Sequence, residues 1–98
     1  MGRLDGRVAI VTGCARGFGE AIAKLFAKEG AAVSICDIIP LKELEEKVGS
    51  EIEATGGKAL CFRVDVSREN QVKILVGKTI ERLGTVDILV NNVGIAGP

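Results

Sequence analysis

The chain has 98 residues, of which 47% are hydrophobic and 27% are charged, a composition typical of one globular domain with a modest core. Thirteen basic residues balance thirteen acidic ones without any basic run, so we expect neither nucleic acid nor an anionic membrane as a partner. No apolar stretch approaches the roughly 20 residues needed to span a bilayer.

The first predicted element is a strand over residues 8–11, a continuous and mostly branched apolar run that ends at a turn. An amphipathic helix follows, from Phe18 to about Glu29. A strand of this kind is typical of a parallel sheet whose two faces are both covered. The expected apolar face of the helix consists of Ala21, Ile22, Leu25 and Phe26.

A glycine-rich turn, residues 12–19, lies between this strand and this helix. Unpaired amides and the dipole at the start of a helix attract an anion, and glycine lets the ligand approach the backbone. We assign Gly13 to the tight bend, Gly17 to the space for a diphosphate, and Gly19 to close packing of the helix on the strand. The turn therefore predicts a nucleotide-binding site.

A second strand over residues 32–36 ends in Asp37. The spacing from Gly19 to this acid is suited to a carboxylate that reaches the adenosine ribose of a dinucleotide. A carboxylate can accept hydrogen bonds from both ribose hydroxyls of NAD. The 2′-phosphate of NADP would instead place like charges a few ångströms apart, which costs on the order of 4 kcal/mol. Asp37 therefore favours NAD over NADP.

The rest of the chain continues the alternation of helices and strands. A helix is predicted from Leu41 to about Ala54, then a strand over residues 58–65. Ser67 is expected to cap the next helix, which ends at Gly84, and a fourth strand covers residues 86–90. The expected core positions are Leu41, Leu44, Val48 and Ile52 in the first of these helices and Val72, Ile74, Leu75, Val76, Ile80 and Leu83 in the second.

The order of these elements is βαβαβαβ. It predicts an α/β fold, a partial doubly wound (Rossmann) parallel sheet with strand order 3-2-1-4. Ligands of such a sheet bind beyond the carboxyl ends of its strands. The glycine-rich turn, Asp37 and the segments after the third and fourth strands meet at that edge, so we expect them to share one site.

The spacing Thr-Gly-x-x-x-Gly-x-Gly over residues 12–19 resembles that of the short-chain dehydrogenase/reductase family. Three further segments are similar to family motifs. Residues 4–13 look like the family's N-terminus, and Asp65-Val66 stands where the family contacts adenine. Residues 91–94, Asn-Asn-Val-Gly, are similar to its Asn-Asn-Ala-Gly. The resemblance covers nearly the whole chain, and four motifs in the right order argue against chance similarity.

The resemblance implies a role for each matching residue after the third and fourth strands. Asp65 would hydrogen-bond the adenine amino group, while the backbone of Val66 would meet the ring. Asn91 would face the adenosine ribose and tie the fourth strand to the turn, through Thr12, and Gly94 would let the backbone pass close to the cofactor. The alternatives are an ordinary turn residue at position 65 and a simple turn after the fourth strand.

Within the turn, we expect Phe18 to pack its ring while its N–H serves the phosphate. Arg16 precedes the second glycine, where a basic residue meets the 2′-phosphate of NADP in some members of the family. Its alternative reading is a solvated arginine or a general phosphate contact. NAD is the expected cofactor, and NADP is the alternative.

The family's chemistry uses a serine and a Tyr-x-x-x-Lys pair beyond the Asn-Asn-Ala-Gly motif, and this sequence contains no tyrosine. We therefore interpret residues 1–98 as the N-terminal NAD-binding part of a Rossmann domain, truncated before the catalytic half and inactive alone. The resemblance implies a homo-oligomeric parent that transfers a hydride between NAD(H) and an alcohol or ketone. The alternatives are a stand-alone, non-catalytic NAD-binding or regulatory module, and a methyltransferase-like site for an adenosyl ligand.

Three cysteines, Cys14, Cys36 and Cys61, lack CxxC spacing, and the sequence contains no histidine. Neither a disulfide framework nor a metal site is therefore predicted. We interpret Cys36 and Cys61 as buried strand residues. Cys14 is interpreted as a packing residue, with a redox sensor as the alternative because a helix N-terminus can lower the pKa of a thiol. No leader segment is recognisable, so we expect a cytoplasmic location.

Overall fold

Four parallel strands form the centre of the computed structural model, which describes residues 2–15 and 17–92. The strands are β1 (Val8–Thr12), β2 (Ala32–Asp37), β3 (Lys58–Arg63) and β4 (Ile88–Val90). They pair in the order β3-β2-β1-β4, and every pair is parallel. The predicted α/β fold and its 3-2-1-4 strand order are thus confirmed.

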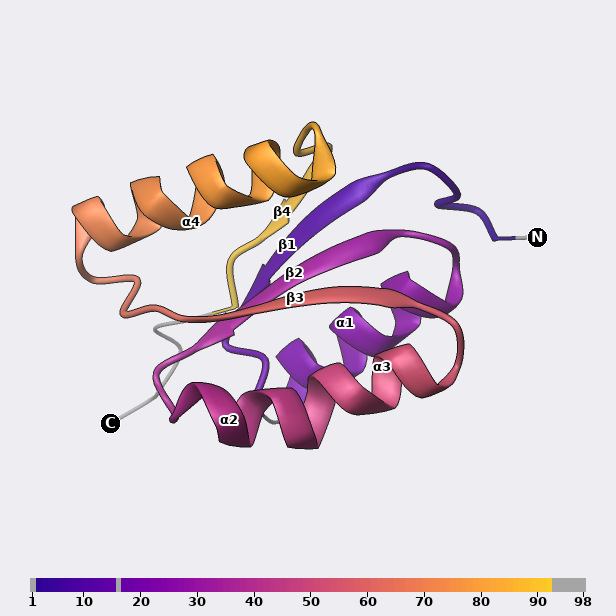
Figure 1. The fold of residues 1–98 in the computed structure, drawn as a ribbon, viewed down its shortest axis with the longest axis horizontal. Coiled ribbons are helices and arrows are strands. Elements are labelled where there is room, and N and C mark those ends of the chain that lie inside the picture. Colours follow the sequence, from indigo (N-terminus) through magenta and orange to yellow (C-terminus); the bar gives the residue numbers. More distant parts are fainter. Residues whose placement is uncertain (1, 16, 93–98) are drawn as a thin grey trace.

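Helices cover both faces of the sheet (Figure 1). One layer contains α1 (Gly17–Lys28) and a continuous helical stretch made of α2 (Leu41–Leu44), η1 (Glu45–Gly49) and α3 (Ser50–Ala54). The other layer is α4 (Glu69–Leu83). Within the described part of the chain, no helix has both the length and the apolar character needed to cross a bilayer.

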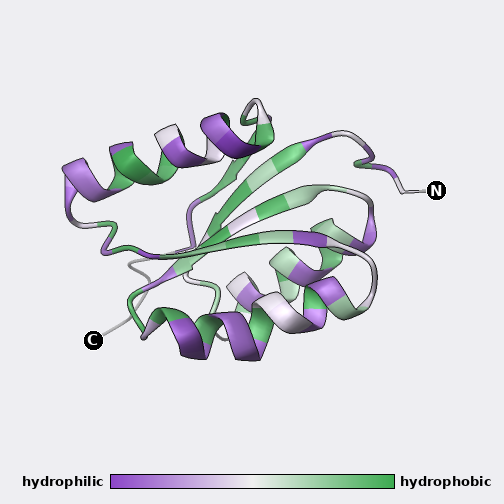
Figure 2. Cartoon of the chain, in the orientation of Figure 1, coloured by the Kyte–Doolittle hydropathy of each residue, from purple (hydrophilic) through white to green (hydrophobic). Residues whose placement is uncertain are grey.

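The core is divided between the two faces of the sheet because neighbouring side chains of a strand point in opposite directions. Ala9 and Val11 pack in the cluster beneath α1 and the α2–α3 stretch, whereas Ile10 packs with Leu75 of α4. All five residues of β1 are buried, as expected for a strand with neighbours on both sides. Figure 2 shows the resulting pattern, with hydrophobic strands between helices that carry many hydrophilic residues.

Helix α1 occupies the predicted range but turns a different face to the sheet. Gly19, Ala23 and Ala27 are its buried residues, spaced four apart, while Leu25 is 54% exposed. Ala21 is exposed as well, and only Ile22 and Phe26 of the predicted face pack against the core. Small side chains let the helix axis lie close to the strands, so the larger side chains are displaced to the flanks.

The predicted helix over residues 41–54 is present, with a π-helical turn in its middle. The five residues Glu45–Gly49 are wider than an α-helical turn, which shifts the helical phase between α2 and α3. Leu44, Val48 and Ile52 face the core as predicted, but Leu41 is 40% exposed. Periodicity alone does not distinguish an α-helix from one that contains a single π turn.

Helix α4 begins and packs differently from the prediction. Ser67 does not cap it: the residue before the helix is Arg68, which makes no side-chain cap, and the Ser67 hydroxyl donates to Asp65 at 2.6 Å instead. Only Leu75 and Thr79 are buried, whereas Ile74 is 57% exposed. The buried Thr79 hydroxyl lies 2.8 Å from Ser34 Oγ of β2, so a polar contact joins this helix to the sheet.

Candidate dinucleotide-binding site

The glycine-rich turn connects β1 to α1 at the carboxyl end of the sheet. Gly13 and Gly17 have φ of 65° and 62°, a left-handed backbone conformation that residues with a side chain rarely adopt. A Cβ atom on Gly17 would point into open space, whereas one on Gly19 would overlap the carbonyl oxygen of Gly13. The backbone therefore leaves open space beside Gly17, and the absence of a side chain at Gly19 lets α1 lie against the turn. An anion placed beside Gly17 would be close to the first-turn amides of the helix, which have no acceptor within the helix.

Phe18 does not pack as predicted. Its side chain is 79% exposed, so the ring lies in solvent beside the first turn of α1 rather than in the core. The neighbouring buried positions are glycine and alanine, which leave no room for a ring between helix and sheet. Arg16 lies outside the described residues.

Asp37 contacts the turn directly, although it belongs to the next strand. Its Oδ2 accepts a hydrogen bond from the N–H of Ala15 at 2.9 Å. Its Oδ1 accepts from the N–H of Ile38 at 2.7 Å and of Ile39 at 3.4 Å. The predicted ribose acid and the predicted phosphate turn are thus joined by a charge-assisted bond at the carboxyl edge of the sheet. The sequence did not predict this bond from Ala15, because a backbone N–H donor leaves no mark on the choice of side chain.

Thr12 joins the turn to the segment after β4. Its side chain is buried, and its hydroxyl lies 3.3 Å from both the Val90 carbonyl oxygen and Asn91 Oδ1, to either of which it can donate. The same oxygen accepts from the N–H of Asn92 at 2.9 Å. Asn92 Nδ2 also donates to the Gly13 carbonyl at 3.5 Å. The predicted tie between Asn91 and the turn through Thr12 is present, and Asn92 adds a second tie that the motif alone did not reveal.

Replacing Thr12 by valine tests this junction. The change keeps the shape of the side chain but leaves the part-buried Asn92 amide without its acceptor, and we expect a loss of about 1–3 kcal/mol in the free energy of unfolding. Urea denaturation measures the loss. Thr12→Ser retains the hydroxyl and serves as the matched control. Equal stability of the valine and serine variants would contradict the role of the hydroxyl.

Asp65 and Val66 follow β3, on the far side of β2 from the turn. Asp65 Oδ1 accepts from the hydroxyl and the N–H of Ser67 at 2.6 and 3.0 Å. These bonds, the hydroxyl first, lower the pKa of Asp65, and the nearby Arg68 lowers it further. Val66 packs against the core beneath α4. The adenine contact of this pair remains a prediction, and Gly94 lies outside the described residues.

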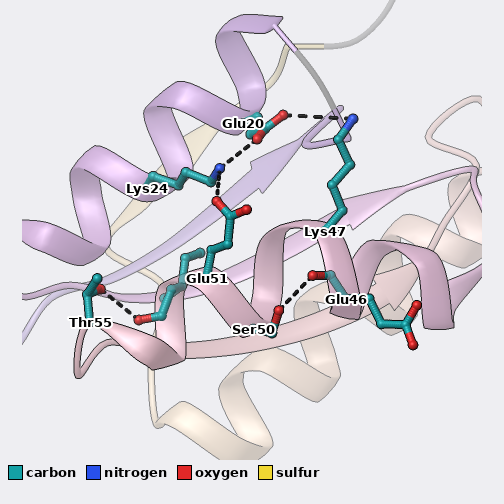
Figure 3. Close-up of polar contacts among 8 residues, drawn as sticks. Glu20, Lys24, Glu46, Lys47, Ser50, Glu51 and Thr55 are labelled. Carbon is teal, nitrogen blue, oxygen red and sulfur yellow. Dashed lines mark hydrogen bonds and ion pairs between the residues drawn. The ribbon is translucent and has the colours of Figure 1, made fainter.

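Glu20 lies in the first turn of α1, where a negative charge would repel a bound phosphate. Two lysines balance it. Lys24 Nζ is 2.6 Å from Glu20 and also bonds Glu51 of α3, and Lys47 Nζ is 3.9 Å from Glu20 (Figure 3). The bonds to Glu20 and then Glu51 raise the pKa of Lys24. The two lysines thereby offset the negative charge of Glu20, and its contact with Lys47 directs it toward the neighbouring helix.

A model of the short chain dehydrogenase family matches residues 7–98. The chain belongs to the short-chain dehydrogenase family. Among curated relatives, an uncharacterized oxidoreductase of Bacillus subtilis, YxbG, is 45% identical over 97% of this chain and 34% of that protein. The 7alpha-hydroxysteroid dehydrogenase of Escherichia coli is 44% identical over 98% of this chain and 37% of that protein.

Solved structures of short-chain dehydrogenases share the fold at similar identity. A hydroxysteroid dehydrogenase from Escherichia coli superposes with a TM-score of 0.90 at 44% identity, covering 98% of this chain and 40% of that one. A 7α-hydroxysteroid dehydrogenase in complex with NADH and 7-oxo glycochenodeoxycholic acid superposes with a TM-score of 0.91 at 44% identity. The match covers 98% of this chain and 37% of that one. This chain therefore spans little more than a third of the relatives that it matches.

The three thiols of this short-chain dehydrogenase segment are packing groups. Cys14 and Cys36 are fully buried, and the Cys14 thiol donates to the Val11 carbonyl at 2.9 Å. Burial raises the pKa of all three thiols, to about 12 for Cys36, to about 11 for Cys61 and higher still for Cys14. The alternative of a redox sensor at Cys14 thus lacks the low pKa that it requires. Among residues 2–15 and 17–92, no group of three acidic, cysteine or histidine side chains is arranged to hold a metal ion.

These raised thiol pKa values predict loss of stability in alkali. Below the ordinary thiol pKa of 9.0, folded and unfolded thiols are both protonated, and the stabilising effect of the neutral buried thiols is complete. Between pH 9.0 and the thiol pKa values of the folded chain, these thiols ionise in the unfolded chain but not in the folded one. At about pH 10.5 we expect a loss on the order of 2 kcal/mol for each of Cys14 and Cys36.

Urea denaturation at about pH 8 and about pH 10.5 measures this effect. A Cys14→Ala/Cys36→Ala variant should lose less stability between the two pH values than the unsubstituted chain. An equal loss in both proteins would show that other groups dominate.

Proposed function

We propose that this chain binds NAD(H) as the N-terminal, cofactor-binding part of an oxidoreductase that transfers a hydride between the nicotinamide and an alcohol or ketone. The observation that carries the proposal is the bond from the Ala15 N–H to Asp37. It joins Asp37, which would hold the ribose, to the turn that would hold the diphosphate, and so supports a ligand that contains both groups. An adenosyl ligand without a diphosphate does not require that combination, so a methyltransferase-like site is disfavoured.

The residues fit the dinucleotide in shape and in charge. Gly13, Gly17 and Gly19 form the cradle, and the N–H groups of the first turn of α1 would hold the diphosphate. Asp37 would accept the ribose hydroxyls, and its charge favours NAD over NADP. The remaining proposed contacts are Arg16, Phe18 through its N–H, Asp65, Val66, Asn91 and Gly94. The bound cofactor would supply the site that gains or loses the hydride.

The 98 residues contain no tyrosine, so the family's Tyr-x-x-x-Lys pair is not among them. We therefore propose that the isolated chain binds cofactor without turning over substrate. The same observation supports one alternative, a non-catalytic module that binds NAD for regulation. The two differ in whether a serine and a Tyr-x-x-x-Lys pair follow Pro98 in the gene, which sequencing through that position decides.

Isothermal titration calorimetry with NADH and with S-adenosylmethionine tests the proposed ligand. We expect saturable binding of NADH and none of S-adenosylmethionine. ADP-ribose, which shares the adenosine and diphosphate groups, should compete with NADH. Binding of S-adenosylmethionine, or no binding of NADH by the folded chain, would overturn the proposal.

A further inference from the structure

Ile38 follows β2 directly and is held at both of its backbone polar groups. Its N–H donates to Asp37 Oδ1 at 2.7 Å. Its carbonyl oxygen accepts from Arg63 Nε at 3.0 Å. Arg63 is the last residue of β3 and pairs in register with Asp37. A carboxylate and a guanidinium therefore fix the same residue, one from its own strand and one from the neighbouring strand.

The bond from Arg63 extends the attachment of β2 to β3 beyond the regular ladder. The last backbone bond between the two segments runs from Val64 N–H to the Asp37 carbonyl, one residue before Ile38. Packing of the Ile38 side chain contributes little, because that side chain is 62% exposed. Arg63 is thus the group on β3 that restrains the chain just after Asp37.

Restraint at Ile38 matters for the Asp37 carboxylate. Its Oδ1 accepts from the N–H groups of Ile38 and Ile39, so the direction of the carboxylate depends on the position of those two residues. Its Oδ2 is directed to Ala15 in the glycine-rich turn. If residues 38 and 39 move, the carboxylate either turns with them or loses those bonds.

We propose that Arg63 is a positioning residue for the adenosine end of the cofactor. By donating through Nε to Ile38, it holds the turn that aims Asp37 at the ribose. The planar guanidinium suits this role because Nε–H has a fixed direction within the plane. The inference rests on the proposed binding of NAD(H). It adds a residue that would act through Ile38 rather than by contact with the cofactor.

Two substitutions separate the hydrogen bond from the charge. In Arg63→Gln, the amide nitrogen is attached to Cδ as Nε is in arginine, so the variant keeps a donor near the Ile38 carbonyl but loses the charge. Arg63→Met has a similar reach with neither donor nor charge. Arg3→Met, an exposed position in the segment before β1, is the matched control at the opposite end of the sheet.

We expect Arg63→Met to weaken binding of both NADH and ADP-ribose by about five- to tenfold in calorimetry, the size of effect expected for the loss of one hydrogen bond. Arg63→Gln and Arg3→Met should stay within about twofold of the unsubstituted chain. Amide hydrogen exchange of Ile38 should accelerate in Arg63→Met and not in Arg63→Gln. Thermal unfolding of each variant verifies that it is folded.

The outcomes are distinct. If Arg63→Gln weakens binding as much as Arg63→Met, the charge of Arg63 is responsible rather than its hydrogen bond to Ile38, and the positioning role is overturned. It is also overturned if methionine leaves both affinities unchanged, or if the Ile38 amide is equally protected in both variants. Failure of the unsubstituted chain to bind NADH is seen before any variant is compared, and it removes the proposed function and this role together.

Discussion

Gly19→Ala is expected to abolish measurable NADH binding and to lower the free energy of unfolding by about 1–3 kcal/mol or more. The added methyl group would overlap the carbonyl oxygen of Gly13 and approach Asn92 Nδ2. The first of these is backbone, so the Gly13 carbonyl cannot move away without displacing α1 or opening the turn. Either movement changes the turn against which the diphosphate is proposed to lie.

Gly77→Ala is the matched control for this prediction. Gly77 lies in the middle of α4, and a Cβ atom there meets nothing within 4 Å. The same chemical change should therefore stabilise the chain by about 0.5–1 kcal/mol, because alanine is the better helix former. Urea denaturation and NADH calorimetry measure both variants. Normal NADH affinity in Gly19→Ala would show that the close packing of helix on turn is not required.

Asp37→Asn is expected to weaken NADH binding and to shift the preference toward NADPH. The carboxylate repels a 2′-phosphate with on the order of 4 kcal/mol at a separation of about 4 Å in a half-exposed site. Even half of that corresponds to more than tenfold in the ratio of the two dissociation constants. Asparagine removes the charge. It also replaces one carboxylate oxygen by an NH2 group, which cannot accept the backbone hydrogen bonds that both oxygens of Asp37 accept, so affinity for NADH should fall as well.

Calorimetry with NADH and NADPH on the wild-type and Asp37→Asn chains gives the ratio directly. Glu81→Gln, an exposed acid on α4, changes the net charge equally and controls for long-range electrostatics. The ratio should change in Asp37→Asn and stay constant in Glu81→Gln. A constant ratio in both variants would remove Asp37 as the residue that selects NAD.

The contact between Asp37 and Ala15 suggests why these two predictions are linked. The carboxylate that would hold the ribose also bonds the backbone of the turn that would hold the diphosphate. A change at either place disturbs the other, so the effects of Gly19→Ala and Asp37→Asn on the free energy of unfolding should not simply add in the double variant.

The order of elements and the topology of the sheet could be predicted from the sequence. Short branched apolar runs separated by helical periodicity lead to parallel strands with right-handed crossovers, and these leave few possible strand orders. The tight bend at Gly13 was equally accessible, because glycine adopts the left-handed conformation readily. The same conformation at Gly17, which was assigned only to the space for a diphosphate, is seen in the structure alone.

The tertiary structure decided which side chains face which neighbours. The small residues Gly19, Ala23 and Ala27 bring α1 close to the strands, so Leu25 and Phe18 lie outside, although hydrophobicity alone predicted that both would pack. The bonds from Asn92 to Thr12, from Ala15 to Asp37 and from Arg63 to Ile38 join residues 80, 22 and 25 positions apart. Periodicity and residue type report local preference, whereas such contacts depend on how neighbouring strands and turns come together in space.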